Sequence, residues 1–265
     1  MLEQKVKTIR ALERGVDVLM EIRRARAVSL HDLHVRLGLP KATLLRILVT
    51  LAGKGLVWQR LADGAYLASH VLEFSPAVDI AETLAEVATE PMAELSAKAN
   101  WPSVLGAPRL DHIEIIETNS PLLRLDSATL GPVGVPLSYI HTATGRAYLA
   151  ACGERERDAI IARLRPPGAS EQSKAQLHAI LREIRERGYS LRDPHFDWPD
   201  RNKQAVVRDG RRSMAVAVYS RGEAVAALNI TWPTKRISTE KIVERHLPTL
   251  REIAARIGSA LEQLS

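Results

Sequence analysis

Apolar residues recur every three or four positions in three consecutive stretches near the start of the chain, which predicts three amphipathic helices. The first two helices cover residues 9–24 and 30–37. Ser29, with Asp32 three residues later, is a capping signal for the start of the second helix, and Gly38 is a signal for its end. The apolar positions predicted to face the core are Leu12, Val16 and Leu19 in the first helix and Leu30, Leu33 and Leu37 in the second.

A third helix is predicted to begin at Pro40, because the missing N–H of proline would have no intrahelical partner in a first turn. The second and third helices are therefore joined by a turn of three to four residues, which is the spacing of a helix-turn-helix. Two β-prone segments, residues 55–60 and 66–67, then flank Asp63-Gly64 and predict a hairpin. Three helices followed by a hairpin predict a winged helix-turn-helix.

The third helix has an apolar stripe on one side and small or polar residues on the other. A helix exposed only to solvent would more often carry several Lys and Glu residues on that far side, whereas close approach to a DNA duplex favours small residues with isolated Arg, Lys and Thr. We expect Thr43 and Arg46 to approach base edges, and Lys41 and Arg60, the latter on the wing, to reach phosphates. The expected DNA-binding residues are Lys41, Thr43, Arg46, Thr50 and Arg60.

The charge distribution supports this interpretation. The chain has 265 residues, with 37 Lys and Arg against 31 Asp and Glu, and a formal charge of +6. Residues 1–70 contain 12 of the basic and 6 of the acidic residues, so the rest of the chain is neutral, with 25 of each. Cations are needed only where the duplex lies, so a basic head on a neutral body is expected of a DNA-binding module attached to a regulatory or catalytic domain.

The rest of the chain mixes short β-prone runs with helical patterns, which predicts an α+β domain with one antiparallel sheet. We expect residues 1–70 to form the winged domain, residues 71–84 a linker and residues 85–265 the second domain. The predicted strands are residues 104–107, 113–117, 122–125, 213–219 and 224–231, with a hairpin turn at 221–223. The predicted helices are residues 80–98, 143–151, 154–165, 174–187 and 238–264.

Residues 29–51, SLHDLHVRLGLPKATLLRILVTL, followed by a wing containing Tyr66-Leu67, resemble the N-terminal domain of IclR-type transcriptional regulators. That family usually has Gly-Leu-Pro-Lys-Ser-Thr where this chain has residues 38–43, and Ala42 stands in place of the serine. The resemblance covers nearly the whole chain. In the second domain it is carried by Val135-Pro136-Leu137, Thr144-Gly145-Arg146-Ala147-Tyr148-Leu149-Ala150, Gly188-Tyr189-Ser190, Met214-Ala215-Val216-Ala217-Val218 and Ala226-Ala227-Leu228-Asn229-Ile230-Thr231.

The resemblance implies a GAF-like or PAS-like effector-binding domain, a small-molecule effector, a double-stranded DNA operator and a homodimer or homotetramer. Within the family, the chain most resembles regulators of aromatic-acid catabolism of the hydroxyphenylpropionate type, in Trp101-Pro102-Ser103, Pro136-Leu137 and His246-Leu247-Pro248. This resemblance implies an aromatic or other small carboxylate as effector. The effector-binding residues implied by the family are His141, Thr142, Ala143, Thr144, Arg192, Asp193, Ser213, Asn229 and Thr231.

Two of these positions leave alternatives open. Asn229 and Thr231 lie two apart on a predicted strand and so face the same side. On a covered side they would need partners, which a ligand could supply, whereas on a wetted side water would serve. Arg192 could hold a ligand carboxylate by charge-assisted hydrogen bonds, or form a surface salt bridge with Asp193 or Asp197.

Motifs for catalysis, metals and membranes are absent from the sequence. There is no G-x-S-x-G, H-E-x-x-H or phosphate-binding loop. His31 and His34 have metal-compatible spacing but no third ligand near, so we expect no metal and no cofactor. No apolar stretch approaches the ~18 residues of a membrane span and no signal peptide is evident, so we expect a cytoplasmic protein without a membrane partner. The alternatives are a small-molecule-converting enzyme with a basic head, with His141 as its candidate residue, and an oligomerisation protein.

Overall fold

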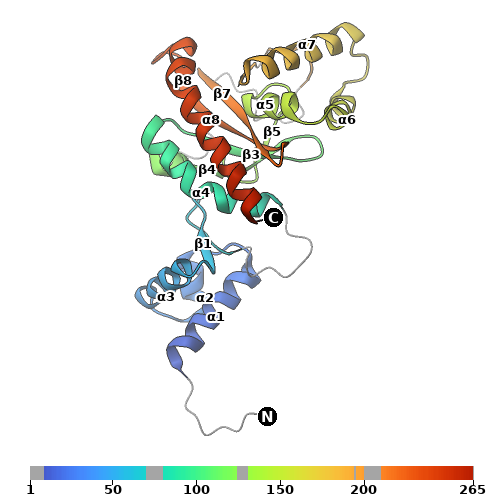
Figure 1. The fold of residues 1–265 in the computed structure, drawn as a ribbon. Coiled ribbons are helices and arrows are strands. Elements are labelled where there is room, and N and C mark those ends of the chain that lie inside the picture. The colour runs from blue at the N-terminus through green and yellow to red at the C-terminus, as the bar shows by residue number, and fades with distance from the viewer. Residues whose placement is uncertain (1–8, 70–79, 124–130, 194, 200–209, 265) are drawn as a thin grey trace. The chain divides into compact units, whose positions relative to one another are not determined.

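The computed structural model describes residues 9–69, 80–123, 131–193, 195–199 and 210–264. The chain divides into two compact units, residues 1–86 and residues 87–265 (Figure 1). The division falls within helix α4 (Ile80–Ala99), which begins where the sequence predicts. Residues 71–79 of the predicted linker lie outside the described residues.

The first unit consists of three helices followed by a short antiparallel hairpin, as the hydrophobic pattern predicts. Helix α2 begins after Ser29 and ends at Gly38, in agreement with the capping signals. Strand β2 also forms a bridge to Val28, which ties the hairpin to the turn before α2. The elements are α1 (Arg10–Ala25), α2 (Leu30–Leu37), α3 (Lys41–Gly53), β1 (Val57–Gln59) and β2 (Tyr66–Ala68). The core residues are Val18, Ile22, Val28, Leu33, Leu44, Leu48 and Val57.

Helix α1 turns a different side to this core than its pattern predicts. Leu12 and Val16 are 63% and 47% exposed, so their prediction as core residues is wrong. Val18 and Ile22 are buried instead, and Leu19 packs at the edge of the core. The helix carries apolar residues on two neighbouring sides, and spacing alone cannot say which of them meets α2 and α3. The second side remains exposed on the described part of the unit.

The second unit contains a six-stranded antiparallel sheet, which confirms the predicted α+β class. The strand order is β5-β4-β3-β8-β7-β6. The hairpin between β7 and β8 turns at Arg221 and Gly222, which both have positive φ, as a type I′ turn requires. The strands are β3 (Val104–Pro108), β4 (Ile113–Thr118), β5 (Pro136–Leu137), β6 (Ser190–Leu191), β7 (Arg211–Ser220) and β8 (Glu223–Pro233).

Helices cover both faces of the sheet (Figure 1). Helix α5 (Ala143–Ala151) packs on β3, β7 and β8, with α7 (Glu171–Arg187) against it, and α8 (Thr239–Leu264) packs on β7 and β8. Two glycines allow close backbone approach. A Cβ at Gly145 of α5 would lie 2.3 Å from the Ser138 carbonyl oxygen. A Cβ at Gly258 of α8 would lie 1.8 Å from the Tyr219 carbonyl oxygen. The remaining helix is α6 (Glu154–Leu164).

The sequence misplaces three features of this unit. Residues 122–123, predicted as part of a strand, end a 3-10 helix (Ser120–Leu123), and residues 124–125 lie outside the described residues. Strands β5 and β6 were not predicted, because two residues are too short for an alternating pattern. Helix α7 begins three residues earlier than predicted, because the Ser170 side chain accepts a hydrogen bond from the Ser173 N–H and caps it.

Candidate nucleic-acid interface and ligand site

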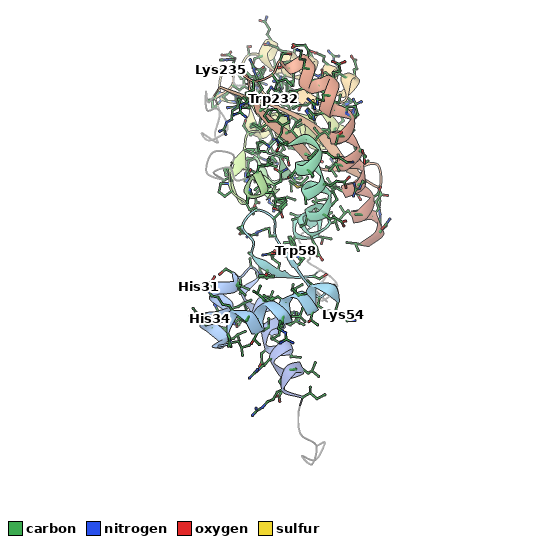
Figure 2. The ribbon with its side chains drawn as sticks, turned by 90° about the vertical axis from the view of Figure 1, so that its left-hand side faces the viewer. His31, His34, Lys54, Trp58, Trp232 and Lys235 are labelled. Atoms are coloured by element: carbon green, nitrogen blue, oxygen red, sulfur yellow. The ribbon has the colours of Figure 1, made fainter. Side chains whose placement is uncertain are left out.

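Local contacts fix the position of α3 relative to α2. The Ser29 side chain accepts a hydrogen bond from the Asp32 N–H at 3.1 Å and caps α2. Gly38 ends that helix with φ 65°, a left-handed conformation that glycine adopts without steric cost. The His34 Nδ1 lies 2.8 Å from the Leu39 carbonyl oxygen and holds the turn. His34 and His31 are therefore parts of the α2 surface and its turn (Figure 2), and no cluster of three or more metal-ligating side chains occurs in the described ranges.

The side of α3 away from the core is exposed, as predicted. Leu44 and Leu48 are buried, while Lys41, Arg46 and Thr50 are exposed and Thr43 is half-buried. Lys41 and Arg46 form no ion pair with any described residue, so both charges are available to a partner. The Thr50 hydroxyl donates to the Arg46 carbonyl oxygen at 2.8 Å, so it is already used within the helix.

Two apolar side chains that sequence reasoning missed also lie on α3. Val49 is 71% exposed and Leu45 is 43% exposed, although both are large and apolar. At ~100° per residue Val49 lies next to Ala42 on the exposed side, and Ala42 stands between it and Arg46. The signal was present in the sequence, because neither residue fits the core stripe. Exposed valine beside a lone arginine suits contact with a partner that offers both polar and methyl groups.

The wing holds Arg60 more tightly than its predicted role requires. Its Nε donates to Asp63 Oδ1 at 3.0 Å and its Nη2 to Oδ2 at 2.5 Å, so the guanidinium is bound in bidentate fashion. Burial opposes ionisation of Asp63, but hydrogen bonds from Arg60 and from the Ala65 N–H hold the pKa of this carboxyl below its ordinary value. Arg60 has to leave this pair before its Nε and Nη2 groups can point at a phosphate together.

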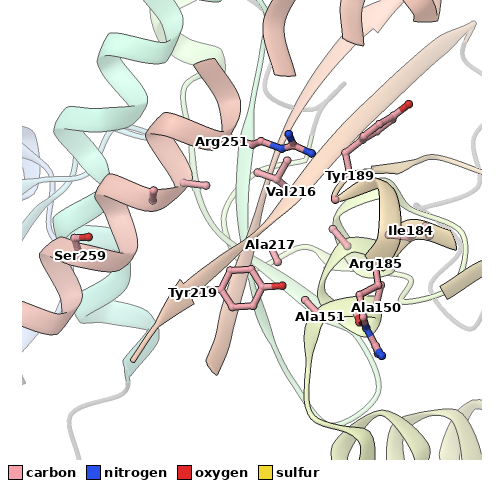
Figure 3. A pocket seen from close by; sticks show the side chains of 14 residues that line it. Ala150, Ala151, Ile184, Arg185, Tyr189, Val216, Ala217, Tyr219, Arg251 and Ser259 are labelled. Atoms are coloured by element: carbon pink, nitrogen blue, oxygen red, sulfur yellow. The ribbon is translucent and has the colours of Figure 1, made fainter. Parts of the chain in front are cut away.

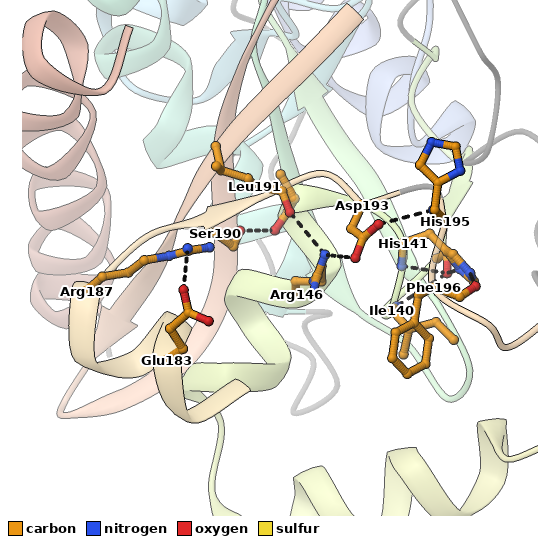
Figure 4. A network of polar contacts seen from close by, with 12 residues as sticks. Ile140, His141, Arg146, Glu183, Arg187, Ser190, Leu191, Asp193, His195 and Phe196 are labelled. Atoms are coloured by element: carbon orange, nitrogen blue, oxygen red, sulfur yellow. Dashed lines mark hydrogen bonds and ion pairs between the residues drawn. The ribbon is translucent and has the colours of Figure 1, made fainter. Parts of the chain in front are cut away.

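The implied effector residues of the second unit are brought together around the N-terminus of α5. Thr142 caps the helix, accepting from the Gly145 N–H at 3.0 Å. His141 is buried, with Nδ1 2.9 Å from the Ser138 hydroxyl and Nε2 3.2 Å from the Phe196 carbonyl oxygen (Figure 4). The Asp193 N–H donates to the His141 carbonyl oxygen at 3.0 Å. The loop after β6 is therefore joined to the start of α5.

Polar side chains of β7 and β8 face α5 from the sheet. Asn229 and Thr231 are buried, so the wetted alternative does not apply. The Asn229 amide donates to the Thr144 hydroxyl at 3.0 Å and accepts from the Val104 N–H at 2.9 Å. The Thr231 and Ser213 hydroxyls lie 2.9 Å apart. These groups satisfy one another within the chain, and a ligand that enters among them must replace some of these hydrogen bonds.

Arg146 is a further residue of this cluster that the sequence did not single out. It is 5% exposed on α5, and its Nη1 lies 3.1 Å from Asp193 Oδ2 (Figure 4). Burial lowers the pKa of the guanidinium, although Asp193 opposes this effect. Its Nε is buried without a hydrogen-bond partner. The ion-pair partner of the implied effector residue Asp193 is therefore Arg146. The pair places the positive charge of Arg146 and its unsatisfied Nε–H donor beside Asp193.

The single thiol of the chain is unsuited to nucleophilic chemistry. Cys152 is 3% exposed, and burial raises the pKa of its thiol to about 12, so the reactive thiolate is essentially absent at neutral pH. The nearby Tyr148 hydroxyl donates to Glu156 at 2.7 Å and packs in the same core. Among the described helices, none has the length and apolar character to cross a membrane.

Two family models match the chain. Residues 80–259 match the bacterial transcriptional regulator IclR C-terminal domain, and residues 11–61 match the IclR helix-turn-helix domain. The first of these covers more than half of the chain, and the second contains the helices and first strand of the winged unit. The resemblance seen in the sequence is therefore confirmed for both units.

Individual relatives agree with this assignment. The chain is 24% identical to the HTH-type transcriptional regulator KdgR of Escherichia coli K12, over 98% of this chain and 95% of that protein. It is 25% identical to the Pca regulon regulatory protein of Pseudomonas putida, over 91% of this chain and 80% of that protein. A solved IclR homolog from Microbacterium hydrocarbonoxydans, complexed with 4-hydroxybenzoate, shares the fold at 23% identity, with a TM-score of 0.53 over 96% of this chain and 100% of that chain. The chain belongs to the IclR family of bacterial transcriptional regulators.

Proposed function

We propose that α3 reads an operator sequence in the major groove through Arg46, Val49 and Thr43. Arg46 is exposed and unpaired by any described acid, and arginine can bind the O6 and N7 atoms of guanine in bidentate fashion. Val49 is apolar and exposed beside it, and suits the C5-methyl group of thymine. The observation that carries this proposal is the combination of one free guanidinium and exposed methyl groups on the side of α3 that the core leaves open.

Phosphate contacts in this proposal come from the start of α3 and from the wing. Helix α3 has no side-chain cap, so its first N–H groups, together with Lys41, are available for a phosphate oxygen. Arg60 contributes when it leaves Asp63. These contacts hold the DNA backbone and carry no information about the base sequence.

The effector in this proposal is a small carboxylate, of the aromatic class, that binds at the start of α5. Support comes from the buried polar cluster of Asn229, Thr231 and Ser213, and from the guanidinium of Arg146 beside it. The Pca regulon relative and the 4-hydroxybenzoate complex of a homolog favour an aromatic acid. A ligand that displaces Asp193 from Arg146 would move the loop after β6 and favour one arrangement of the protein over another.

A homodimer, or a pair of dimers, completes the proposal. The side of α1 that the core does not use exposes four apolar residues, Ile9, Leu12, Val16 and Met20, at helical spacing. Such a stripe is typical of a surface covered by a partner, and a second copy of the chain would cover it in a two-fold arrangement. Two-fold symmetry presents two α3 helices to half-sites one or more helical turns apart. We place this activity in the cytoplasm, where the DNA of a bacterium lies.

The effector part is tested by fluorescence anisotropy on a duplex selected from a random library. Aromatic carboxylates, starting with benzoate and 4-hydroxybenzoate, are added to the protein–DNA complex. We expect at least one of them to change the Kd for DNA severalfold, and we expect Asn229→Leu to remove that response while leaving DNA binding without ligand intact. His178→Leu is the control, since His178 is half-buried on α7 and is not one of the implied effector residues. A response that survives in Asn229→Leu and is lost in the control would overturn the assignment.

A further inference from the structure

A groove in the second unit lies apart from every implied effector residue. It opens between α5, α7, β7 and α8, with a cavity volume of about 390 Å³ (Figure 3). Strand β6 pairs only with Met214 and Ala215 of β7, so beyond Ala215 the outer edge of β7 has no strand neighbour in the described part of the sheet. Six of its fourteen lining residues are alanines, whose small side chains leave the space open. A volume of this size is within the range of small-molecule sites.

The charged groups that line the groove are of one sign. Arg185 and Arg251 line it, and no aspartate or glutamate does. Arg185 Nε donates to the Ala150 carbonyl oxygen at 2.9 Å, and Arg251 Nη2 donates to that of Arg187 at 2.8 Å. Each guanidinium therefore uses one of its nitrogen atoms to bind a carbonyl oxygen near the C-terminus of a helix. Neither guanidinium forms an ion pair with a described carboxylate. The remaining donors favour an anion.

Two tyrosines complete the walls. Figure 3 shows Arg251 extending toward Tyr189 at one end, and Tyr219 turned toward Arg185 at the other. The Arg187 guanidinium lies 4.8 Å from the centre of the Tyr189 ring and steadies it. Burial raises the pKa of Tyr219, against the effect of Arg185, so its hydroxyl stays protonated at neutral pH and can donate. The groove therefore combines an apolar floor, aromatic walls and hydrogen-bond donors at its ends.

We propose that this groove is a second small-molecule site, specific for an organic anion with a flat apolar body, such as an aromatic carboxylate. The apolar body would lie over Ala147, Ala217 and Ala254, and the anion would take donors from Arg185 or Arg251. Helix α5 links the two sites. Ala143 and Thr144 of the effector cluster lie at the start of α5, and Ala150 and Ala151 of the groove lie at its end.

Isothermal titration calorimetry of the full chain with 2-naphthoate tests the site. We expect 2-naphthoate binding to survive Asn229→Leu, which alters the effector cluster, and to be lost when Ala255→Phe is added to that variant, because phenylalanine fills the groove from an exposed position on α8. Arg185→Gln combined with Arg251→Gln should weaken it about tenfold, because charge-assisted hydrogen bonds are lost. The neutral 2-naphthalenemethanol should bind more weakly than 2-naphthoate.

Ala175→Phe and Arg182→Gln are the matched controls, since both residues are exposed on α7 outside the groove. Circular dichroism melting curves establish that each variant folds. Loss of 2-naphthoate binding in Asn229→Leu with full binding in Ala255→Phe would assign the ligand to the effector cluster and overturn the proposal. Absence of any binding to the wild-type chain would overturn it as well.

Discussion

Replacing Val49 by alanine tests whether the exposed apolar side chain of α3 reads a thymine methyl group. The substitution removes two methyl groups, each worth at most about 0.8 kcal/mol when fully buried. Val49 is 71% exposed in the free chain, so about seven-tenths of this gain is still available on binding. Contact with a single thymine methyl covers only part of the side chain. We therefore expect a loss of about 0.8 kcal/mol, which is roughly fourfold in Kd.

The assay is fluorescence anisotropy on a selected operator and on copies in which single thymines are replaced by uracil, which lacks only the methyl group. For the contacted base, the fourfold loss in Val49→Ala should vanish on the uracil duplex, because the methyl group is already gone. Val35→Ala on α2 is the control, since Val35 is 66% exposed and lies on another helix. Equal losses on the thymine and uracil duplexes at every position would refute the reasoning.

Three further predictions concern the wing, the α1 stripe and the α5 packing. Arg60→Ala should weaken binding to all duplexes alike and reduce the salt slope by up to about one, whereas Asp63→Asn should strengthen binding by releasing Arg60. Filter binding across salt concentrations measures both, and tighter binding by Arg60→Ala or weaker binding by Asp63→Asn would contradict the phosphate role. Val16→Asp should shift the chain toward monomer in sedimentation equilibrium, and an unchanged mass would contradict the dimer surface. Gly145→Ala should cost about 1–3 kcal/mol in urea unfolding, because its Cβ would meet backbone atoms, and an unchanged midpoint would contradict the close approach.

The helix boundaries of the winged unit could be predicted because their signals are local. Ser29 and Gly38 act within one turn of the chain, so the residue types alone mark where α2 starts and stops. The buried side of α1 could not be predicted, because the choice between Val16 and Val18 depends on how α1 meets α2 and α3. Tertiary packing decides between two apolar sides that spacing leaves equal.

The same distinction applies to the sites. The side of α3 that bears Arg46 follows from helical geometry, and Asn229 was placed by family resemblance. The Arg146–Asp193 pair joins residues 47 positions apart through a loop, and the sequence carries no local sign of it. The groove beside β7 depends on β6 being only two residues long, which no alternating pattern can reveal. Features that form between segments far apart in the sequence could be identified only from the structure.

The affinity of Arg46→Ala for the selected operator and for a scrambled duplex tests the central claim most directly. The wild-type chain should prefer the operator by orders of magnitude, as specific DNA-binding proteins do. Arg46→Ala should lose most of this preference while its affinity for the scrambled duplex changes little, because Arg46 is expected to contact bases rather than phosphates. Unchanged discrimination in the variant would contradict the claim that this side of α3 reads the sequence.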